Sequence, residues 1–125
     1  MRSVLARQSV LIVEDEPLVA LDVHATLSAA GASLISAATA REAIELIAYA
    51  EISAAIVDVQ LGREDATQVC NLLDQRRIPF VFYTGRAQKT VLLAAWPNIH
   101  VVKKPATPQA IISALEALLE PLSDH

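Results

Sequence analysis

The chain is poor in the residues that cross-link or anchor a fold. Its one cysteine, Cys70, leaves no partner for an internal disulfide and too few thiols for a cysteine-based zinc site. No basic leader precedes an apolar stretch, and no apolar run approaches the ~20 residues that span a membrane. Lys and Arg number 10 against 14 Asp and Glu, which gives a net charge of −4 and no basic face for nucleic acid or an anionic membrane. These absences predict a cytoplasmic protein that binds neither nucleic acid nor membrane directly.

Apolar residues, in contrast, are abundant. They make up 54% of the 125 residues, charged residues make up 19%, and the mean hydropathy is +0.41. A chain of this size and composition can bury one hydrophobic core without cross-links. No repeat, linker or low-complexity tract interrupts it. We therefore expect one domain over residues 1–125, with its core over about 9–119.

Short apolar runs and helical segments alternate five times along the chain. The apolar runs, rich in β-branched residues, cover residues 10–13, 33–36, 54–57, 80–83 and 99–102. The helical segments cover residues 17–31, 39–49, about 64–76, 91–95 and 107–119, and Thr39 and Thr107 are their clearest N-caps. Strict alternation predicts an α/β fold whose parallel sheet has helices on both faces. Right-handed crossovers then favour a doubly wound, flavodoxin-like sheet of five strands in the order 2-1-3-4-5.

The first helical segment has distinct start and stop residues. Pro17 suits the first turn, where its missing N–H costs nothing, and Gly31 suits the position after the last turn. Leu18 and Leu21 fall between them at helical spacing. We therefore expect a helix that ends before Gly31.

Polar residues follow four of the five predicted strands. Glu14 and Asp15 follow the first strand, Asp58 the third, Thr84 the fourth and Lys104 the fifth. The carboxyl ends of parallel strands lie at the same edge of a sheet, which is where such folds bind ligands. We therefore expect these five side chains to converge on one site.

The chemistry of this set limits what the site can do. Two carboxylates ~4 Å apart repel by about 4 kcal/mol at an effective dielectric constant near 20, so either one of them takes up a proton or a cation joins them. Carboxylate oxygens without sulfur or imidazole suit Mg²⁺. The Thr84 hydroxyl and the Lys104 ammonium suit an anion such as a phosphoryl group, and a carboxylate such as Asp58 can accept that group.

The chain resembles a response regulator receiver domain of the CheY-like superfamily from about Ser9 to Leu119. Residues 10–17, Val-Leu-Ile-Val-Glu-Asp-Glu-Pro, resemble the first strand and acidic pair of that family. Asp58 stands at the position of its phospho-accepting aspartate, and Thr84 at that of its switch hydroxyl. Lys104 before Pro105 resembles its Lys-Pro motif, for which a cis peptide bond is expected.

The resemblance implies a role in two-component signal transduction. Asp58 is expected to take a phosphoryl group from a histidine of a sensor histidine kinase or a histidine phosphotransfer protein, in a Mg²⁺-dependent reaction. Lys104 and Thr84 are expected to contact that group, and phosphorylation to change the binding of a downstream protein partner. The protein is then not an enzyme beyond self-phosphorylation and slow self-dephosphorylation of Asp58. We expect no output domain within these 125 residues.

The resemblance also implies a metal site. Asp15 and Asp58 are expected to bind Mg²⁺ directly, Glu14 through water, and Gln60 through its backbone carbonyl. Gln60 and Arg86 flank the site, where they are expected to tune hydrolysis of the phosphoryl group.

Three positions depart from the family pattern. Many receivers carry Tyr or Phe where this chain has Val101, and Pro where it has Gly62. Phe82-Tyr83-Thr84-Gly85 is similar to the Phe-Ala-Thr-Gly motif of a subgroup of stand-alone receivers, with Tyr83 in place of the small residue. We hypothesise that Tyr83, or repacking near Trp96, takes over from the missing aromatic switch.

Two other functions and one assembly stay open at this point. Haloacid-dehalogenase-type phosphatases share the aspartate, Mg²⁺, hydroxyl and lysine, but their nucleophile follows the first strand in an Asp-x-Asp pattern, whereas the third strand here ends in Asp58-Val59-Gln60. A pseudo-receiver would act as an unphosphorylated scaffold. A homodimer through the last helices and the fifth strand is a further possibility, because leucines are plentiful in the segment 107–119.

Overall fold

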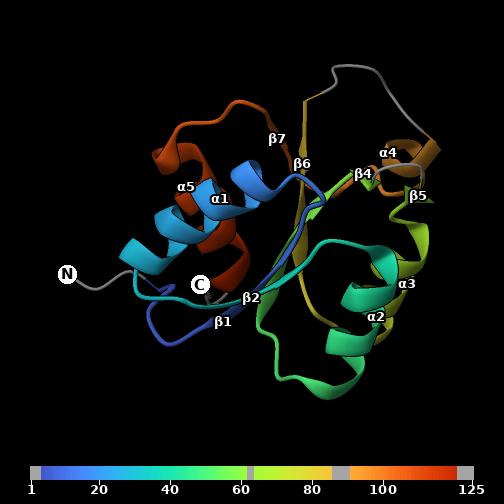
Figure 1. Cartoon of the computed structure of the whole chain (residues 1–125), viewed down its shortest axis with the longest axis horizontal. Coiled ribbons are helices and arrows are strands. Elements are labelled where there is room, and N and C mark those ends of the chain that lie inside the picture. Colours follow the sequence, from blue (N-terminus) through green and yellow to red (C-terminus); the bar gives the residue numbers. More distant parts are fainter. Residues whose placement is uncertain (1–3, 62–63, 86–90, 121–125) are drawn as a thin grey trace, which may run out of the picture.

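A five-stranded parallel sheet forms the centre of the molecule (Figure 1). The computed structural model describes residues 4–61, 64–85 and 91–120. The sheet consists of β1 (Ser9–Val13), β2 (Ser33–Ala37), β3 (Ala54–Asp58), β6 (Phe80–Thr84) and β7 (Val101–Lys103). Their order is β2-β1-β3-β6-β7, which confirms the predicted order 2-1-3-4-5 of the five parallel strands.

Helices cover both faces of this sheet, as expected for a doubly wound fold (Figure 1). Helices α1 (Pro17–Ala29) and α5 (Pro108–Leu119) pack against each other on one face. Helices α2 (Ala40–Tyr49) and α3 (Thr67–Gln75) pack on the other, and the short α4 (Val91–Ala95) adds Leu92 to the core on that side. In the part of the chain that the structure describes, no helix combines the length and the apolar character needed to cross a membrane.

Alternate residues of each central strand enter two separate cores. In β1, Val10 and Ile12 pack with α1 and α5, whereas Leu11 and Val13 pack with α2 and α3. All four are at most 1% exposed. A strand covered on both faces needs apolar side chains on both, which explains the continuous apolar runs in the sequence.

The predicted helix caps are formed. The Thr39 hydroxyl accepts a hydrogen bond from the backbone N–H of Glu42 at 3.1 Å, and the Glu42 carboxylate accepts one from the N–H of Ala38 at 2.8 Å. At the start of α5, the Thr107 hydroxyl accepts from the N–H of Ala110 at 3.1 Å. These bonds satisfy backbone donors that the helix itself leaves free.

The start of the third helix was predicted three residues too early. Residues Glu64–Asp65 form the short strand β5, which pairs antiparallel with β4 (Gln60–Leu61), and α3 begins only at Thr67. The chain therefore turns back on itself after β3 before it becomes helical.

The fifth strand also differs from its prediction of 99–102. It covers Val101–Lys103, because the N–H of Ile99 bonds to the carbonyl of Trp96 at 3.2 Å and so belongs to the turn after α4.

The helical spacing of Leu18 and Leu21 does not mark the buried side of α1. These side chains are 82% and 65% exposed, and Val23 and Leu27 are the buried residues of the helix. The predicted stop is correct: Gly31 follows the helix with φ +95, and a Cβ there would lie 3.2 Å from Ala6.

Candidate functional site

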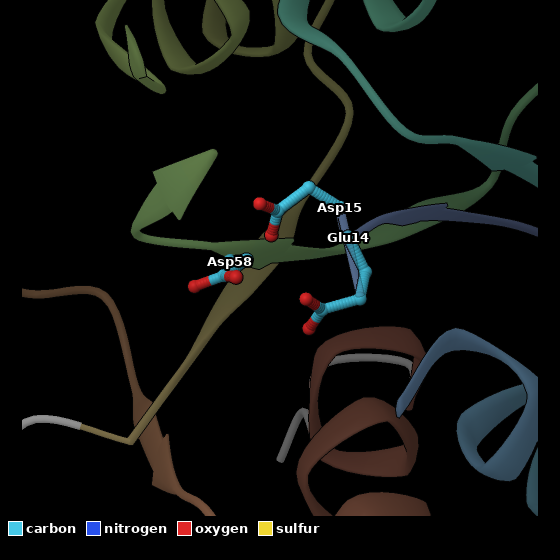
Figure 2. A group of neighbouring side chains, drawn as sticks. All are labelled: Glu14, Asp15 and Asp58. Atoms are coloured by element: carbon cyan, nitrogen blue, oxygen red, sulfur yellow. The ribbon is translucent and has the colours of Figure 1, made fainter. Parts of the chain in front are cut away.

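Three carboxylates meet at the carboxyl edge of the sheet (Figure 2). Glu14 and Asp15 directly follow β1, and Asp58 is the last residue of β3. The two strands are neighbours, with Val13 opposite Val57, so their ends lie side by side. One oxygen from each of the three carboxylates lies within 4.8 Å of the others. The predicted convergence of the acidic residues is thus present.

Glu14 is the most enclosed of these acids, with 4% of its surface exposed. Its backbone N–H donates to the carbonyl of Ala37 at 2.9 Å, and its carboxylate accepts the N–H of Glu16 at 3.1 Å. Burial raises the pKa of Glu14 to about 7, because the charged form loses hydration; the nearby Asp58 acts in the same direction, whereas Lys104 and the Glu16 N–H oppose it. Near neutral pH, Glu14 therefore exchanges between its two protonation states when no metal is bound.

Lys104 brings a positive charge to the carboxylates. Its Nζ lies 2.8 Å from Oε1 of Glu14, 3.3 Å from Oδ2 of Asp58 and 3.8 Å from Oε1 of Glu16. Burial acts to lower the pKa of Lys104, but its contacts with Glu14 and Asp58 outweigh burial and raise that pKa above its usual 10.5. The side chain is therefore an ammonium cation throughout the physiological range.

The backbone fixes where Lys104 begins. Its N–H donates to the carbonyl of Thr84 at 2.8 Å, which extends the pairing of β6 and β7 by one residue. The peptide bond between Lys104 and Pro105 is cis, as the resemblance to the Lys-Pro motif implied. The neighbouring Lys103 is exposed, so only one of the two lysines enters the site.

The two remaining predicted residues are Thr84 and Gln60. Thr84 lies next to Asp58 across the sheet, and Gln60 lies next to it along the chain. Thr84 ends β6 and is 5% exposed; β3 and β6 are paired with Asp58 opposite Tyr83, so Thr84 is one residue beyond that pair. The backbone N–H of Gln60 donates to Oδ1 of Asp58 at 3.2 Å. The role expected of the Gln60 carbonyl stays a prediction, and Gly62 and Arg86 lie outside the described residues.

Two residues contact Lys104 in ways that were not predicted. Glu16 reaches Lys104 from the residue before α1, and the ring of Tyr83 has its centre 5.3 Å from the Lys104 Nζ. Sequence spacing offers a signal for both: Glu16 follows Asp15 directly, and Tyr83 precedes Thr84 on a strand that ends at the site.

The donor set fits a hard divalent cation. Mg²⁺ binds oxygen at about 2.1 Å, so two of its ligands lie at most ~4.2 Å apart, and the carboxylate oxygens here need to move by less than about 1 Å to meet that limit. Among the residues that the structure describes, Lys104 is the lysine beside these three acids, and its single charge leaves excess negative charge, which a cation would neutralise. Asp15, Asp58 and Glu14 are therefore the residues that would hold Mg²⁺.

Comparison with known proteins agrees with this geometry. Residues 10–116 match the family model described as the response regulator receiver domain. The chain is 27% identical over 114 residues to the phyllosphere-induced regulator PhyR of Methylorubrum extorquens. That alignment covers 88% of this chain, and the chain spans only 43% of the length of PhyR.

Solved structures share the fold. A response regulator receiver protein from Sinorhizobium medicae is 26% identical, with a TM-score of 0.80 and coverage of 90% of this chain and 94% of that one. The response regulator PhyR from Brucella abortus has a TM-score of 0.77 at 23% identity, with 94% of this chain and 49% of that chain covered. The family model spans most of the chain, and its fold is that of CheY-like receivers. The chain therefore belongs to the family of response regulator receiver domains.

Proposed function

We propose that the protein is a phosphorylation-controlled receiver in which Asp58 accepts a phosphoryl group from a histidine of a partner protein. The observation that carries the proposal is the environment of the Asp58 carboxylate. It is 7% exposed, lies within reach of two further acids, and has a lysine ammonium 3.3 Å from one of its oxygens. An anion held in that place is ready to attack phosphorus once the surrounding negative charge has been neutralised.

The proposed transfer is a direct displacement. An Asp58 oxygen attacks phosphorus, the P–N bond of the phosphohistidine breaks, and its electron pair stays on the imidazole nitrogen, which takes up a proton. Bound Mg²⁺ would neutralise charge on the phosphoryl oxygens. Lys104 contacts Asp58 before the reaction and is proposed to pair with the added phosphoryl group afterwards. Thr84, at the end of the adjacent strand, is proposed to donate a hydrogen bond to the same group.

The consequence of phosphorylation is proposed to be a change in protein binding. The phosphoryl group adds a charge of about −1.5 to −2 at neutral pH, next to a lysine that already has three carboxylate neighbours. Such a charge shifts a two-state element when its two conformations contact the group differently. The sensor kinase or phosphotransfer protein and the downstream partner are proposed by family resemblance, and a dimer through the last helices and the fifth strand of the sheet stays a prediction.

Labelling with a small phosphodonor such as phosphoramidate tests the proposal. The wild-type protein with Mg²⁺ is expected to take up about one phosphoryl group, while Asp58→Asn and wild-type protein with EDTA take up none. Asp74→Asn is the matched control, because Asp74 is an exposed aspartate outside the site and its substitution leaves labelling intact.

Labelling that survives Asp58→Asn would contradict the role of Asp58. Steady release of inorganic phosphate over many turnovers would favour the phosphatase alternative, and absence of labelling under all conditions would favour the scaffold.

A further inference from the structure

Tyr83 is buried beside Lys104. It is 5% exposed, and the Nζ of Lys104 lies 5.3 Å from the centre of its ring. A cation within about 6 Å of an aromatic centre is attracted by the negative face of the ring, and the attraction grows when water is excluded. The Lys104 side chain is 14% exposed, so both partners are largely shielded from water.

The sheet places Tyr83 on the strand between Asp58 and Lys104, the two residues whose contact the proposed function needs. Strand β6 lies between β3 and β7, and Tyr83 is opposite Asp58 on one side and opposite Val102 on the other. Lys104 follows β7 with its N–H bonded to Thr84. The ring therefore starts from the strand that separates Asp58 from Lys104, and its position is set by backbone pairing on both edges.

The Lys104 ammonium has several carboxylates within or near its reach. Glu14 at 2.8 Å and Asp58 at 3.3 Å hold it inside the site, whereas Glu16 lies 3.8 Å from it and is 66% exposed, and Asp22 lines the same cavity of about 440 Å³ as Tyr83 and Lys104. The lysine stem has several freely rotating bonds, so these acids compete for its charge. We expect Lys104 to pair with the transferring phosphoryl group only while its ammonium stays beside Glu14 and Asp58.

We propose that Tyr83 is a positioning residue that holds the Lys104 ammonium on Asp58 through the face of its ring. The inference rests on the proposed function, in which Lys104 pairs with the transferring phosphoryl group. It gives Tyr83 a fixed role beside Lys104, in place of the rotating aromatic that Val101 does not provide. Tyr83 acts through Lys104 and does not itself contact the phosphoryl group.

Two substitutions distinguish the effect of the aromatic face of Tyr83 from the effect of its size. Tyr83→Leu keeps an apolar side chain but removes the aromatic face, and we expect labelling by phosphoramidate with Mg²⁺ to slow about three- to tenfold, the range of a partly desolvated cation–π contact. Tyr83→Phe restores the face and is expected to restore the rate to within about twofold of wild type. Rates are measured well below the thermal midpoint of each variant.

The same substitution in a Lys104→Gln background tests whether Tyr83 acts through the lysine. We expect Tyr83→Leu to have no further effect there, because the cation is already gone. An undiminished effect of Tyr83→Leu in that background, or equal rates for Tyr83→Leu and wild type, would overturn the proposal.

A spectroscopic readout keeps this test apart from that of the proposed function. The Lys104 Nζ lies over the ring, so the NMR signals of the protons on the adjacent ε-carbon are expected to be shifted upfield in wild type and Tyr83→Phe, and to return to ordinary positions in Tyr83→Leu. The signal needs no phosphorylation. A protein that shows the shift but is never labelled refutes the proposed function alone, whereas unshifted signals in the wild type refute the role of Tyr83.

Discussion

At the scale of single residues, the described part of the site combines three carboxylates with the ammonium group of Lys104. Lys104 contacts Glu14 at 2.8 Å and Asp58 at 3.3 Å, so it shares two of the three acids that would hold a metal ion. Its positive charge repels a second cation bound to the same acids. We therefore expect Lys104 and Mg²⁺ to oppose each other before phosphorylation and to bind an added phosphoryl group cooperatively.

This opposition predicts tighter metal binding when the lysine charge is removed. Lys104→Met is expected to lower the dissociation constant for Mg²⁺ by about tenfold, equivalent to ~1.4 kcal/mol, because a unit charge a few ångströms away interacts by a few kcal/mol at most in a partly solvated site. Isothermal titration calorimetry measures the constant. Lys103→Met is the control, since Lys103 is exposed and outside the cluster. Equal affinities for Lys104→Met and wild type would show that the lysine does not affect the metal.

Glu14 predicts a pH dependence of stability in the absence of metal. Its pKa is raised from 4.5 to about 7 in the folded protein, so the folded state holds a proton that the unfolded state releases in this window. The contribution of Glu14 to stability is therefore greatest below pH ~4.5 and is lost as pH rises through about 7.

Glu14→Gln removes this titration while keeping the shape of the side chain. The free energy of unfolding of the variant, relative to wild type, is expected to rise between pH 5 and 8 in urea titrations with EDTA. Parallel pH profiles for the two proteins would contradict the raised pKa.

At the scale of elements, helix α1 shows how packing selects among apolar residues. Leu18 and Leu27 lie on the same helix, yet Leu18 is 82% exposed and Leu27 is 0% exposed. Leu27→Ala is expected to lower the free energy of unfolding by roughly 2–5 kcal/mol, because it leaves a cavity in the core. Leu18→Ala is expected to change it by less than about 0.5 kcal/mol.

Urea unfolding of the two variants measures both changes in the free energy of unfolding. Comparable losses from Leu18→Ala and Leu27→Ala would mean that α1 packs on the sheet through a different side.

The same helix shows a feature that the sequence could not predict, namely which of its apolar residues are buried. Nearly every position of α1 is apolar or small, so periodicity could not distinguish the buried Val23 from the exposed Leu21. Helices α2 and α5 were easier, because Thr39 and Thr107 mark their starts by a local hydrogen bond that depends on the sequence alone.

The segment between β3 and α3 was missed for a related reason. The helical pattern at Glu64–Asp65 is no weaker than in the residues that follow. These two residues nevertheless form a strand, because their backbone pairs with Gln60–Leu61. Two-residue strands carry too few side chains to produce a periodic signal. The local preference was overruled by a contact that sequence does not display.

At the scale of the whole molecule, the site exists because the topology brings separate segments together. Glu14 follows β1, Asp58 ends β3 and Lys104 follows β7, and the parallel arrangement puts the ends of these strands at one edge. This part of the site was predictable, since alternation fixes strand direction. Side-chain contacts such as that of Lys104 with Tyr83 were not, because they depend on rotamers and burial.

Metal binding is expected to stabilise the whole fold. A ligand that binds only the folded state adds about 2.7 kcal/mol at a hundred times its dissociation constant, so Mg²⁺ is expected to raise the thermal midpoint of the wild-type protein. Asp15→Asn is expected to lose most of this gain, because Asp15 is one of the three converging acids. Asp22→Asn, with the same change of charge on α1, is expected to keep it.

Differential scanning calorimetry with and without Mg²⁺ measures these shifts. A gain of the same size in Asp15→Asn and Asp22→Asn would place the metal outside the cluster.

The chemical trapping of the phosphorylated residue tests the central claim most directly. The protein is incubated with phosphoramidate and Mg²⁺, reduced with borohydride, which converts an aspartyl phosphate to homoserine, and mapped by peptide mass spectrometry. The account predicts homoserine at position 58 and aspartate at positions 15, 22, 65 and 74. Homoserine at another position, or intact aspartate at position 58 in protein that has taken up phosphate, would contradict it.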